Sequence, residues 1–223
     1  MNETPRAWYE GITRYQWTVL VIASLGWSFD VFEGALYVAT RTAAWGELLG
    51  TTNTANWDMG ALAAFLVGGA LGGVFFGSLS DRIGRVRTLI FTILMYSLFT
   101  CLTAFSQTAW QLLVLRFLVA TGVGGNWAVA SAMVAEVFPK HARAWSLSIF
   151  HASSLMGVLL AVAVGTFLGT NPAFGWRWCY GVGLLPALLC VWVFKSLREP
   201  EQWLQAKELA REGRSRQTGR IAD

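Results

Sequence analysis

The sequence predicts an all-α membrane protein with six transmembrane helices. Three observations carry this prediction: hydrophobic residues make up 55% of the 223 residues, charged residues make up only 13%, and several long runs contain no Asp, Glu, Lys or Arg. So few charges cannot cover the surface of a protein folded in water, and the same composition excludes an intrinsically disordered chain. Three cysteines are too few to hold a chain of this length together as a disulfide scaffold.

Each predicted helix meets or nearly meets the length of a membrane crossing. A hydrocarbon core about 30 Å thick requires about 20 apolar residues. Met59 to Ser80 and Phe117 to Ala135 are two uncharged runs of this kind, and the polar Ser106-Gln107-Thr108 separates two others. The six predicted helices cover about residues 16–40, 57–79, 88–106, 109–137, 145–168 and 176–195.

Lys and Arg are distributed unequally between the two sides of the predicted bundle. Fourteen of the seventeen lie in residues 1–15, in the loops after the second and fourth helices, and from Lys195 onward, against Arg41 and Arg177 on the other side. Because cytoplasmic segments carry the excess of positive charge, we expect a multi-pass protein of the plasma (inner) membrane with both termini in the cytoplasm. Residues 1–15 then form a cytoplasmic N-terminus. Residues 196–223 form a basic cytoplasmic tail that either lies on anionic lipid or begins an interdomain linker.

Three charged residues lie far from the ends of the predicted spans that contain them, Asp30 and Glu33 in the first and Arg116 in the fourth. A charge at mid-membrane costs about 2.5–3.5 kcal/mol even on lenient scales, so such residues are usually paired and functional. The spacing of three places both acids on one helix face. Asp30 lies roughly 20 Å from the cytoplasmic side and Arg116 roughly 10 Å from the outer side, which predicts a contact between them.

This predicted pair has a functional and a structural interpretation. A carboxylate beside an arginine gives up its proton more readily than an unpaired one in a low dielectric, so making and breaking the pair could couple a proton to transport. The alternative is a static pair that fixes helix packing, although buried pairs are weak stabilisers. The proton is the only coupling ion we expect, and we expect no cofactor. Five other residues are candidates for the substrate cavity, although each alone is more often an interhelical hydrogen bond or packing residue: Asn126, Trp127, His151, Ser153 and Ser154.

Glycines recur at four-residue intervals in the second helix, at Gly69, Gly73 and Gly77. This spacing stacks small residues on one face and lets two helix backbones approach closely, so we predict a packing role. Gly122, Gly124 and Gly125 in the fourth helix either pack in the same way or allow that helix to bend.

The segment after the second helix is the most specific in the chain. It reads Gly77-Ser-Leu-Ser-Asp81-Arg82-Ile-Gly84-Arg85-Val-Arg87, and it resembles the loop signature of the major facilitator superfamily at every fixed position. Arg116-Phe117 with the glycines that follow is similar to that family's fourth-helix motif. The segments 136–143 and 198–203 resemble the sugar-porter and metabolite–proton symporter branches, including sialate and aromatic-acid transporters.

This resemblance implies a fold and a function. The chain would be one half of a twelve-helix fold, built as a three-plus-three inverted repeat, and the carboxy-terminal six-helix half would be missing. The function implied is proton-coupled symport of a small hydrophilic metabolite, an organic acid or a sugar, by alternating access. A cytoplasmic gate would be formed by Gly77, Asp81, Arg82, Gly84, Arg85, Glu136 and Arg143, and proton coupling would fall to Asp30, Arg116 and Glu33.

Other functions fit the sequence less well. The chain is expected to be a fragment or one of a split pair, so a non-transporting scaffold and an uncoupled facilitator stay open as alternatives. An intramembrane serine protease would need a Gly-x-Ser-x-Gly-like setting, which is absent, and His141, His151 and scattered cysteines give no metal-ligand spacing. Asn171-Pro172-Ala173 matches a water-channel tripeptide, but it occurs once where two copies are needed. We expect no enzyme activity and no nucleic acid partner.

Overall fold

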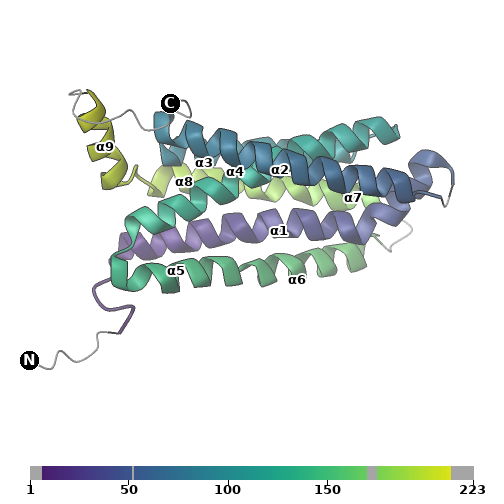
Figure 1. The fold of residues 1–223 in the computed structure, drawn as a ribbon. Helices are drawn as coiled ribbons and strands as arrows, with labels where there is room; N and C mark the ends of the chain where they lie inside the picture. Colours follow the sequence, from purple (N-terminus) through teal and green to yellow (C-terminus); the bar gives the residue numbers. More distant parts are fainter. Residues whose placement is uncertain (1–6, 52, 170–174, 212–223) are drawn as a thin grey trace, which may run out of the picture.

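The computed structural model describes residues 7–51, 53–169 and 175–211. All regular secondary structure in this part of the chain is helical, and six of its helices are long and apolar enough to cross a membrane. These spans lie side by side in one bundle (Figure 1). The predicted all-α fold with six spans is therefore confirmed.

The spans are built from eight α-helices, and a ninth follows them. The first four spans are single helices, the fifth is α5 with α6 and a π-helical turn η1, and the sixth is α7 and α8 joined by a 3-10 turn η2. The bounds are α1 Arg14–Leu49, α2 Ala55–Ile83, α3 Arg85–Thr103, α4 Ala109–Val137, α5 Lys140–Ala152, α6 Ser154–Val164, η1 Gly165–Gly169, α7 Gly175–Gly181, η2 Val182–Leu184, α8 Leu185–Ser196 and α9 Glu201–Arg211.

Helix α1 is longer than the predicted 16–40. It begins at a capping box, in which Thr13 and Gln16 bond each other's backbone N–H groups, and it ends at Gly50 with a φ of 63°. The predicted end at residue 40 falls just before Arg41. That charge does not stop the helix, because Arg41 pairs with Asp58 of α2 at 2.6 Å.

Helices α1 and α4 lie at the centre of the bundle. Helix α4 packs against α1, α2 and α3, while α1 also packs along α6 and touches α8, which in turn lies on α3. Two apolar clusters form the core, one toward each end of the bundle. On α4 the boundary between these clusters falls between Leu112 and Val119, and Arg116 lies in this interval.

Helices α2 and α4 approach so closely that glycine is required at their contact. A Cβ atom at Gly72 would overlap the carbonyl group of Thr121, and one at Gly124 would overlap the carbonyl group of Gly69. At Gly73, by contrast, a Cβ would keep 3.5 Å from the nearest backbone oxygen. The glycines of α2 and α4 therefore lie in a helix contact, as glycine-rich faces in membranes do.

The other two α4 glycines contact aromatic side chains. A Cβ at Gly122 would come within 2.8 Å of the Cβ of Tyr96 on α3, and a Cβ at Gly125 would come within 2.8 Å of the Cβ of Phe76 on α2. Because neither position has room for a side chain, both glycines serve packing. Helix α4 runs unbroken through them from Ala109 to Val137, with no bend or turn assigned at these positions.

One end of the bundle, called the basic end below, gathers Arg14, Arg82, Arg85, Lys140 and Lys195. The start of α1, the α2–α3 junction, the α4–α5 junction and the end of α8 all lie there, with α9 beside them (Figure 1). The hydroxyl group of Tyr15 ties the start of α1 to the segment between α8 and α9 by donating to the carbonyl oxygen of Arg198 at 2.8 Å.

Candidate functional site

Asp30 and Glu33 of α1 and Arg116 of α4 form a buried ionisable cluster. Each of the three residues is only 2% exposed. The two acids are one turn apart on the same face of α1, as the spacing predicted. An Nη1–H of Arg116 donates to Oε1 of Glu33, so an ion pair joins the first and fourth spans inside the bundle.

The partner of Arg116 differs from the one that the sequence predicted. Arg116 pairs with Glu33 in this structure, and the predicted contact with Asp30 is not formed. The reason is geometric: the two acids are three residues apart and differ in depth by about 4.5 Å, slightly less than one helical turn. A depth estimated from helix boundaries that are uncertain by two to four residues cannot distinguish them.

Asp30 is bonded to a neutral group instead. The side-chain amide of Asn126 on α4 donates to Oδ2 of Asp30 at 2.7 Å. Within the described residues, Oδ1 of Asp30, Oδ1 of Asn126 and the hydroxyl oxygen of Tyr96 have no hydrogen-bond partner, although all three are buried. Such atoms are rare in folded proteins because they lose water without gaining a bond. The hydroxyl group of Tyr96 nevertheless lies near enough to Asp30 to interact with its carboxyl group, so the surroundings of Asp30 offer a further hydrogen-bonding group.

The cluster is also unbalanced in charge. It contains two carboxyl groups and one guanidinium group, and none of the three faces solvent. With both acids ionised it carries one net negative charge, which is costly to bury without a counter-ion. Binding one proton makes the cluster neutral. The arrangement is therefore suited to holding and releasing a single proton.

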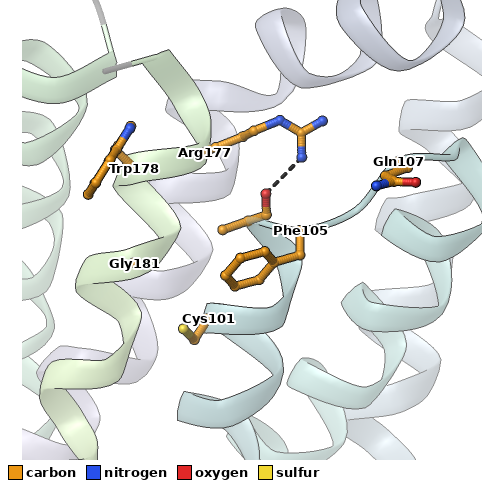
Figure 2. Close-up of a pocket in the computed structure, with 7 residues that line it drawn as sticks. Cys101, Phe105, Gln107, Arg177, Trp178 and Gly181 are labelled. Carbon is orange, nitrogen blue, oxygen red and sulfur yellow. Dashed lines mark hydrogen bonds between the residues drawn. The ribbon is translucent and has the colours of Figure 1, made fainter. Parts of the chain in front are cut away.

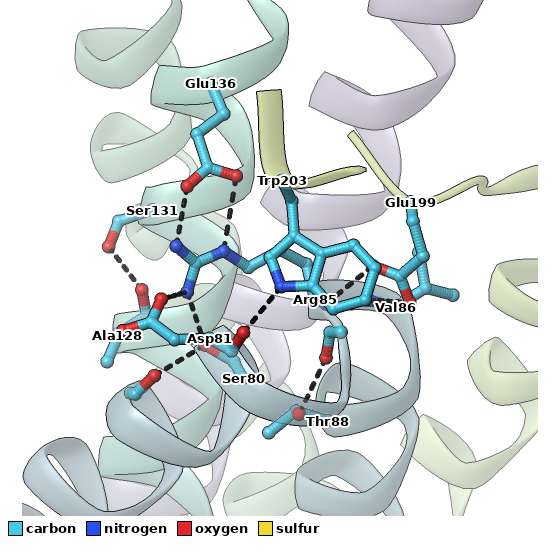
Figure 3. A network of polar contacts seen from close by, with 12 residues as sticks. Ser80, Asp81, Arg85, Val86, Thr88, Ala128, Ser131, Glu136, Glu199 and Trp203 are labelled. Atoms are coloured by element: carbon cyan, nitrogen blue, oxygen red, sulfur yellow. Dashed lines mark hydrogen bonds and ion pairs between the residues drawn. The ribbon is translucent and has the colours of Figure 1, made fainter. Parts of the chain in front are cut away.

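A second polar network lies at the basic end, where α2, α3 and α4 meet (Figure 3). Arg85 is at its centre and pairs with both oxygens of Glu136, through Nη2 at 2.6 Å and Nε at 3.2 Å. Its Nη1 also lies 2.8 Å from Oδ1 of Asp81. Bidentate arginine–carboxylate pairs are among the stronger polar contacts, so this network ties three helices together at the basic end.

Arg143 and Arg82 were both predicted from the sequence to belong to this network. Arg143 forms no ion pair with any described residue, and its buried Nε has no hydrogen-bond partner, so it is not joined to Arg85 and Glu136. Arg82 lies on the exposed face of the last turn of α2. The sequence could not separate Arg143 from Arg85, because each follows a predicted acid of the network, Glu136 for Arg143 and Asp81 for Arg85.

Two members of the network lie after the last span and were not assigned to it from the sequence. The carboxylate of Glu199 accepts from the backbone N–H groups of Arg85 at 2.6 Å and Val86 at 3.2 Å, so it caps the start of α3. The indole N–H of Trp203 on α9 donates to the carbonyl oxygen of Asp81 at 2.8 Å. The segment 198–203 stood out in the sequence, but nothing in it indicated its partner.

Gly84 joins α2 to α3 beneath Glu199. Its φ of 116° is in the region that favours glycine, and a Cβ there would overlap the Glu199 carboxylate. Gly77, the first residue of the signature, accepts a 2.7 Å hydrogen bond from the hydroxyl group of Ser80 at its carbonyl oxygen. Gly84 therefore serves the geometry of this junction, whereas a Cβ at Gly77 would meet only the Cβ of Ala128 at 3.9 Å.

The predicted cavity residues fall into two groups. Trp127 of α4 and His151 of α5 are exposed and adjacent, with ring centroids 6.3 Å apart, and Trp27 of α1 lies 6.1 Å from the same imidazole. Ser153 is half-buried at the break between α5 and α6, and its hydroxyl group is taken up by backbone carbonyl oxygens. Ser154, which begins α6, is partly exposed.

A cavity of about 520 Å³ lies at the opposite end of the bundle, between the end of α3 and α7 (Figure 2). Among its described lining residues, the one charged side chain is that of Arg177. Its guanidinium donates to the carbonyl oxygens of Ala104 and Ser106 at 2.7 Å and pairs with Glu47 at 2.9 Å. This arginine is thus occupied by the protein itself. The described residues also bring together no group of three His, Cys, Asp or Glu side chains that could hold a metal ion.

Comparison with known proteins places these observations in a family. The family described as Major Facilitator Superfamily matches residues 17–218. The niacin transporter NiaP of Acinetobacter baylyi is 32% identical over 193 residues, which cover 86% of this chain and 43% of that protein. The sialic acid transporter NanX of Escherichia coli is 29% identical over 201 residues, which cover 90% of this chain and 48% of that protein.

The solved structures agree on the fold. The proton:xylose symporter XylE superposes with a TM-score of 0.75 at 21% identity, covering 86% of this chain and 47% of XylE. The chain spans about half the length of the curated relatives it matches. These relatives are transporters and not enzymes, and the multi-pass helical fold is one half of theirs. The chain therefore belongs to the major facilitator superfamily.

Proposed function

We propose that this chain is the amino-terminal half of a proton-coupled transporter that carries a small organic acid across the inner membrane by alternating access. The observation that carries the proposal is the buried cluster of Asp30, Glu33 and Arg116, whose charge is unbalanced by one. In its favour, intramembrane ionisable residues of transporters commonly form proton relays.

The proton would move as Arg116 exchanges partners. In the arrangement described above, Arg116 neutralises Glu33 and a proton on Asp30 makes the cluster neutral. When the helices rock, Arg116 shifts one turn toward the basic end and pairs with Asp30, which then releases its proton. Glu33, left without a counter-ion, takes up a proton in turn. Each carboxyl group thus holds the proton only while the other holds the arginine.

The network around Arg85 would act as the cytoplasmic gate. Its location agrees with the positive-inside rule, by which the basic end and both termini lie in the cytoplasm. While Arg85 holds Asp81 and Glu136, the inner ends of α2, α3 and α4 stay together, which favours the outward-facing state. Separation of these groups would open the cytoplasmic side.

An organic acid is favoured over a sugar as the substrate. Relatives of this chain are named for niacin, gentisate and benzoate, all of which carry a carboxylate on an aromatic ring. Trp127, His151 and Trp27 offer rings for stacking and an imidazole that can donate to a carboxylate. We assign substrate contact to these three side chains.

Transport would require a second six-helix half. Members of this family hold the substrate between two halves, so six helices supply one wall of the cavity. We therefore expect liposomes containing this chain alone not to take up niacin or benzoate. The competing function, a non-transporting scaffold, is supported by the same half-length match.

The test is uptake by the full transporter that contains this chain, reconstituted in liposomes with radiolabelled niacin and benzoate. Asp30→Asn should abolish accumulation driven by a pH gradient while exchange of internal for external substrate survives. The matched control is Glu47→Gln, which changes an acid near the outer end of the same helix, with a side chain 53% exposed, and should accumulate substrate normally. Accumulation by Asp30→Asn at the normal rate would contradict proton coupling, and an absence of both activities in the unmodified transporter would favour the scaffold.

A further inference from the structure

Four side chains form a polar cluster at the end of the bundle opposite the basic end. Tyr37, Arg41 and Trp45 lie on successive turns of α1, and Asp58 lies in the first turn of α2. The hydroxyl group of Tyr37 donates to Oδ1 of Asp58 at 2.9 Å and accepts from the indole N–H of Trp45 at 3.0 Å. Arg41 pairs with the other oxygen of Asp58 at 2.6 Å. We call these four residues the Tyr37 clamp.

The clamp reaches from the surface to the buried ion pair. Arg41 and Asp58 have side chains 43% and 25% exposed, whereas Tyr37 is 7% exposed and Trp45 is fully buried. The ring of Tyr37 faces inward and lies 4.2 Å from the guanidinium carbon of Arg116. The hydroxyl group of Tyr37 is thus held by the partly exposed Asp58 and the buried Trp45, while its ring contacts the arginine that neutralises Glu33.

Arg116 is held by aromatic rings from two helices. Besides Tyr37 of α1, the ring of Phe65 on α2 lies 4.8 Å from the guanidinium carbon. A desolvated cation gains from the face of an aromatic ring, so these contacts favour the position in which Arg116 reaches Glu33. Helices α1 and α2 touch each other at few other points, so Asp58 is the main polar tie between them.

From these contacts we propose that Tyr37 is a positioning residue for proton coupling, and that Asp58 acts on Glu33 through Tyr37 and Arg116. Movement of α2 away from α1 at this end would remove the acceptor of the Tyr37 hydroxyl group. The ring would then no longer fix the guanidinium group against Glu33. This inference rests on the proposed function for the role of the ion pair in transport. The predicted effect of Tyr37 on the Glu33–Arg116 pair itself does not depend on transport.

Several other titratable groups surround the pair and bear on any pH measurement. They come from four helices: Asp30 on α1, Asp58 on α2, Tyr96 on α3 and Tyr180 on α7. Tyr180 provides a matched control. It is 0% exposed, compared with 7% for Tyr37, and its hydroxyl oxygen accepts from Thr40 at 3.1 Å, but its ring is not over the guanidinium group of Arg116.

The experiment is infrared titration of the purified chain in lipid nanodiscs, which requires no transport. The carboxylic acid band of Glu33 is identified by its loss in Glu33→Gln. Tyr37→Leu, which removes the ring, should raise the pH at which Glu33 binds a proton by about one unit, a tenfold change in proton affinity. Tyr37→Phe keeps the ring but loses both hydrogen bonds of the hydroxyl group. It should raise the proton affinity of Glu33 about threefold, a shift in the same direction and smaller than that of Tyr37→Leu. Tyr180→Phe should leave it unchanged.

A double-mutant cycle tests the route of the effect. Asp58→Leu should shift the Glu33 titration about as far as Tyr37→Phe does, and it should have no further effect in the Tyr37→Leu background. An undiminished effect of Asp58→Leu in that background would overturn the proposed route. Equal titrations of Glu33 in the wild-type chain, Tyr37→Phe and Tyr37→Leu would overturn the positioning role, even if transport proved to be proton-coupled. If Tyr37→Phe shifts the titration but the full transporter moves no protons, the positioning role stands and the proposed function fails.

Discussion

Removing one member of the Glu33–Arg116 pair should destabilise the bundle far more than removing both. Both residues are 2% exposed, so a partner left behind is a buried charge without its counter-ion unless it can bind or release a proton. Breaking a buried pair in this way costs about 3–5 kcal/mol, whereas replacing both members with apolar or neutral groups of similar size is close to neutral. We therefore expect Glu33→Gln and Arg116→Met each to lose about 3–5 kcal/mol of unfolding free energy.

The two single variants should respond differently to pH. In Arg116→Met the remaining Glu33 can bind a proton and lose its charge, so the loss should be smaller at about pH 5 than at about pH 8. In Glu33→Gln the remaining arginine cannot lose its charge, so the loss should not diminish in acid. In Glu33→Gln, Asp30 is the acid left within one turn. Asp30→Asn should therefore lower the unfolding free energy more in the Glu33→Gln background than in the wild-type chain.

The measurement is reversible unfolding of the purified chain in bicelles, followed by circular dichroism. For a chain of this size each kcal/mol corresponds to about 2–4 °C, so the single variants should melt about 6–20 °C below the wild-type chain. The double variant Glu33→Gln/Arg116→Met should recover most of this loss. A double variant whose loss equals the sum of the two single losses would refute the pairing, because independent sites add.

Three further predictions concern the packing and the network. Gly124→Ala should cost about 1–3 kcal/mol because its Cβ would overlap the Gly69 carbonyl group, while Gly69→Ala, whose Cβ has 3.8 Å of room, should be nearly neutral in the same melting assay. Glu199→Gln should weaken the cap of α3 by about 1 kcal/mol, seen as faster amide exchange at Arg85 and Val86; unchanged exchange there would contradict the cap. Glu136→Gln should lose about 1–3 kcal/mol, and Arg143→Gln less than about 0.5 kcal/mol; equal losses would argue that Arg143 belongs to the network after all.

The membrane-spanning architecture could be predicted from the sequence because it depends on composition and length alone. A run without charges that is long enough to cross the bilayer has few alternatives, so six spans were identified. The prediction of a helix end was wrong where a charged residue lies within a helix that continues beyond it. The first predicted helix ended just before Arg41, yet α1 runs to Leu49, since Asp58 on another helix pairs with that arginine.

The site could be predicted only in part. The three buried ionisable residues were found because charge within an apolar run is exceptional, but their pairing depends on differences in depth of one helical turn. Tyr96 and Tyr37 gave no signal, because a tyrosine in a transmembrane run is ordinary. Glu199 was missed as a cap for α3 because its partner lies more than a hundred residues earlier in the sequence.

The central claim is that the buried cluster carries one proton and that Asp30 holds it while Arg116 is paired with Glu33. Infrared spectroscopy of the purified chain in nanodiscs at about pH 7 tests this directly, since a protonated carboxyl group has its own carbonyl band. We predict such a band in the wild-type chain and in Tyr180→Phe, and its loss in Asp30→Asn. A spectrum without a protonated carboxyl band at this pH, or a band that persists in Asp30→Asn, would contradict the claim.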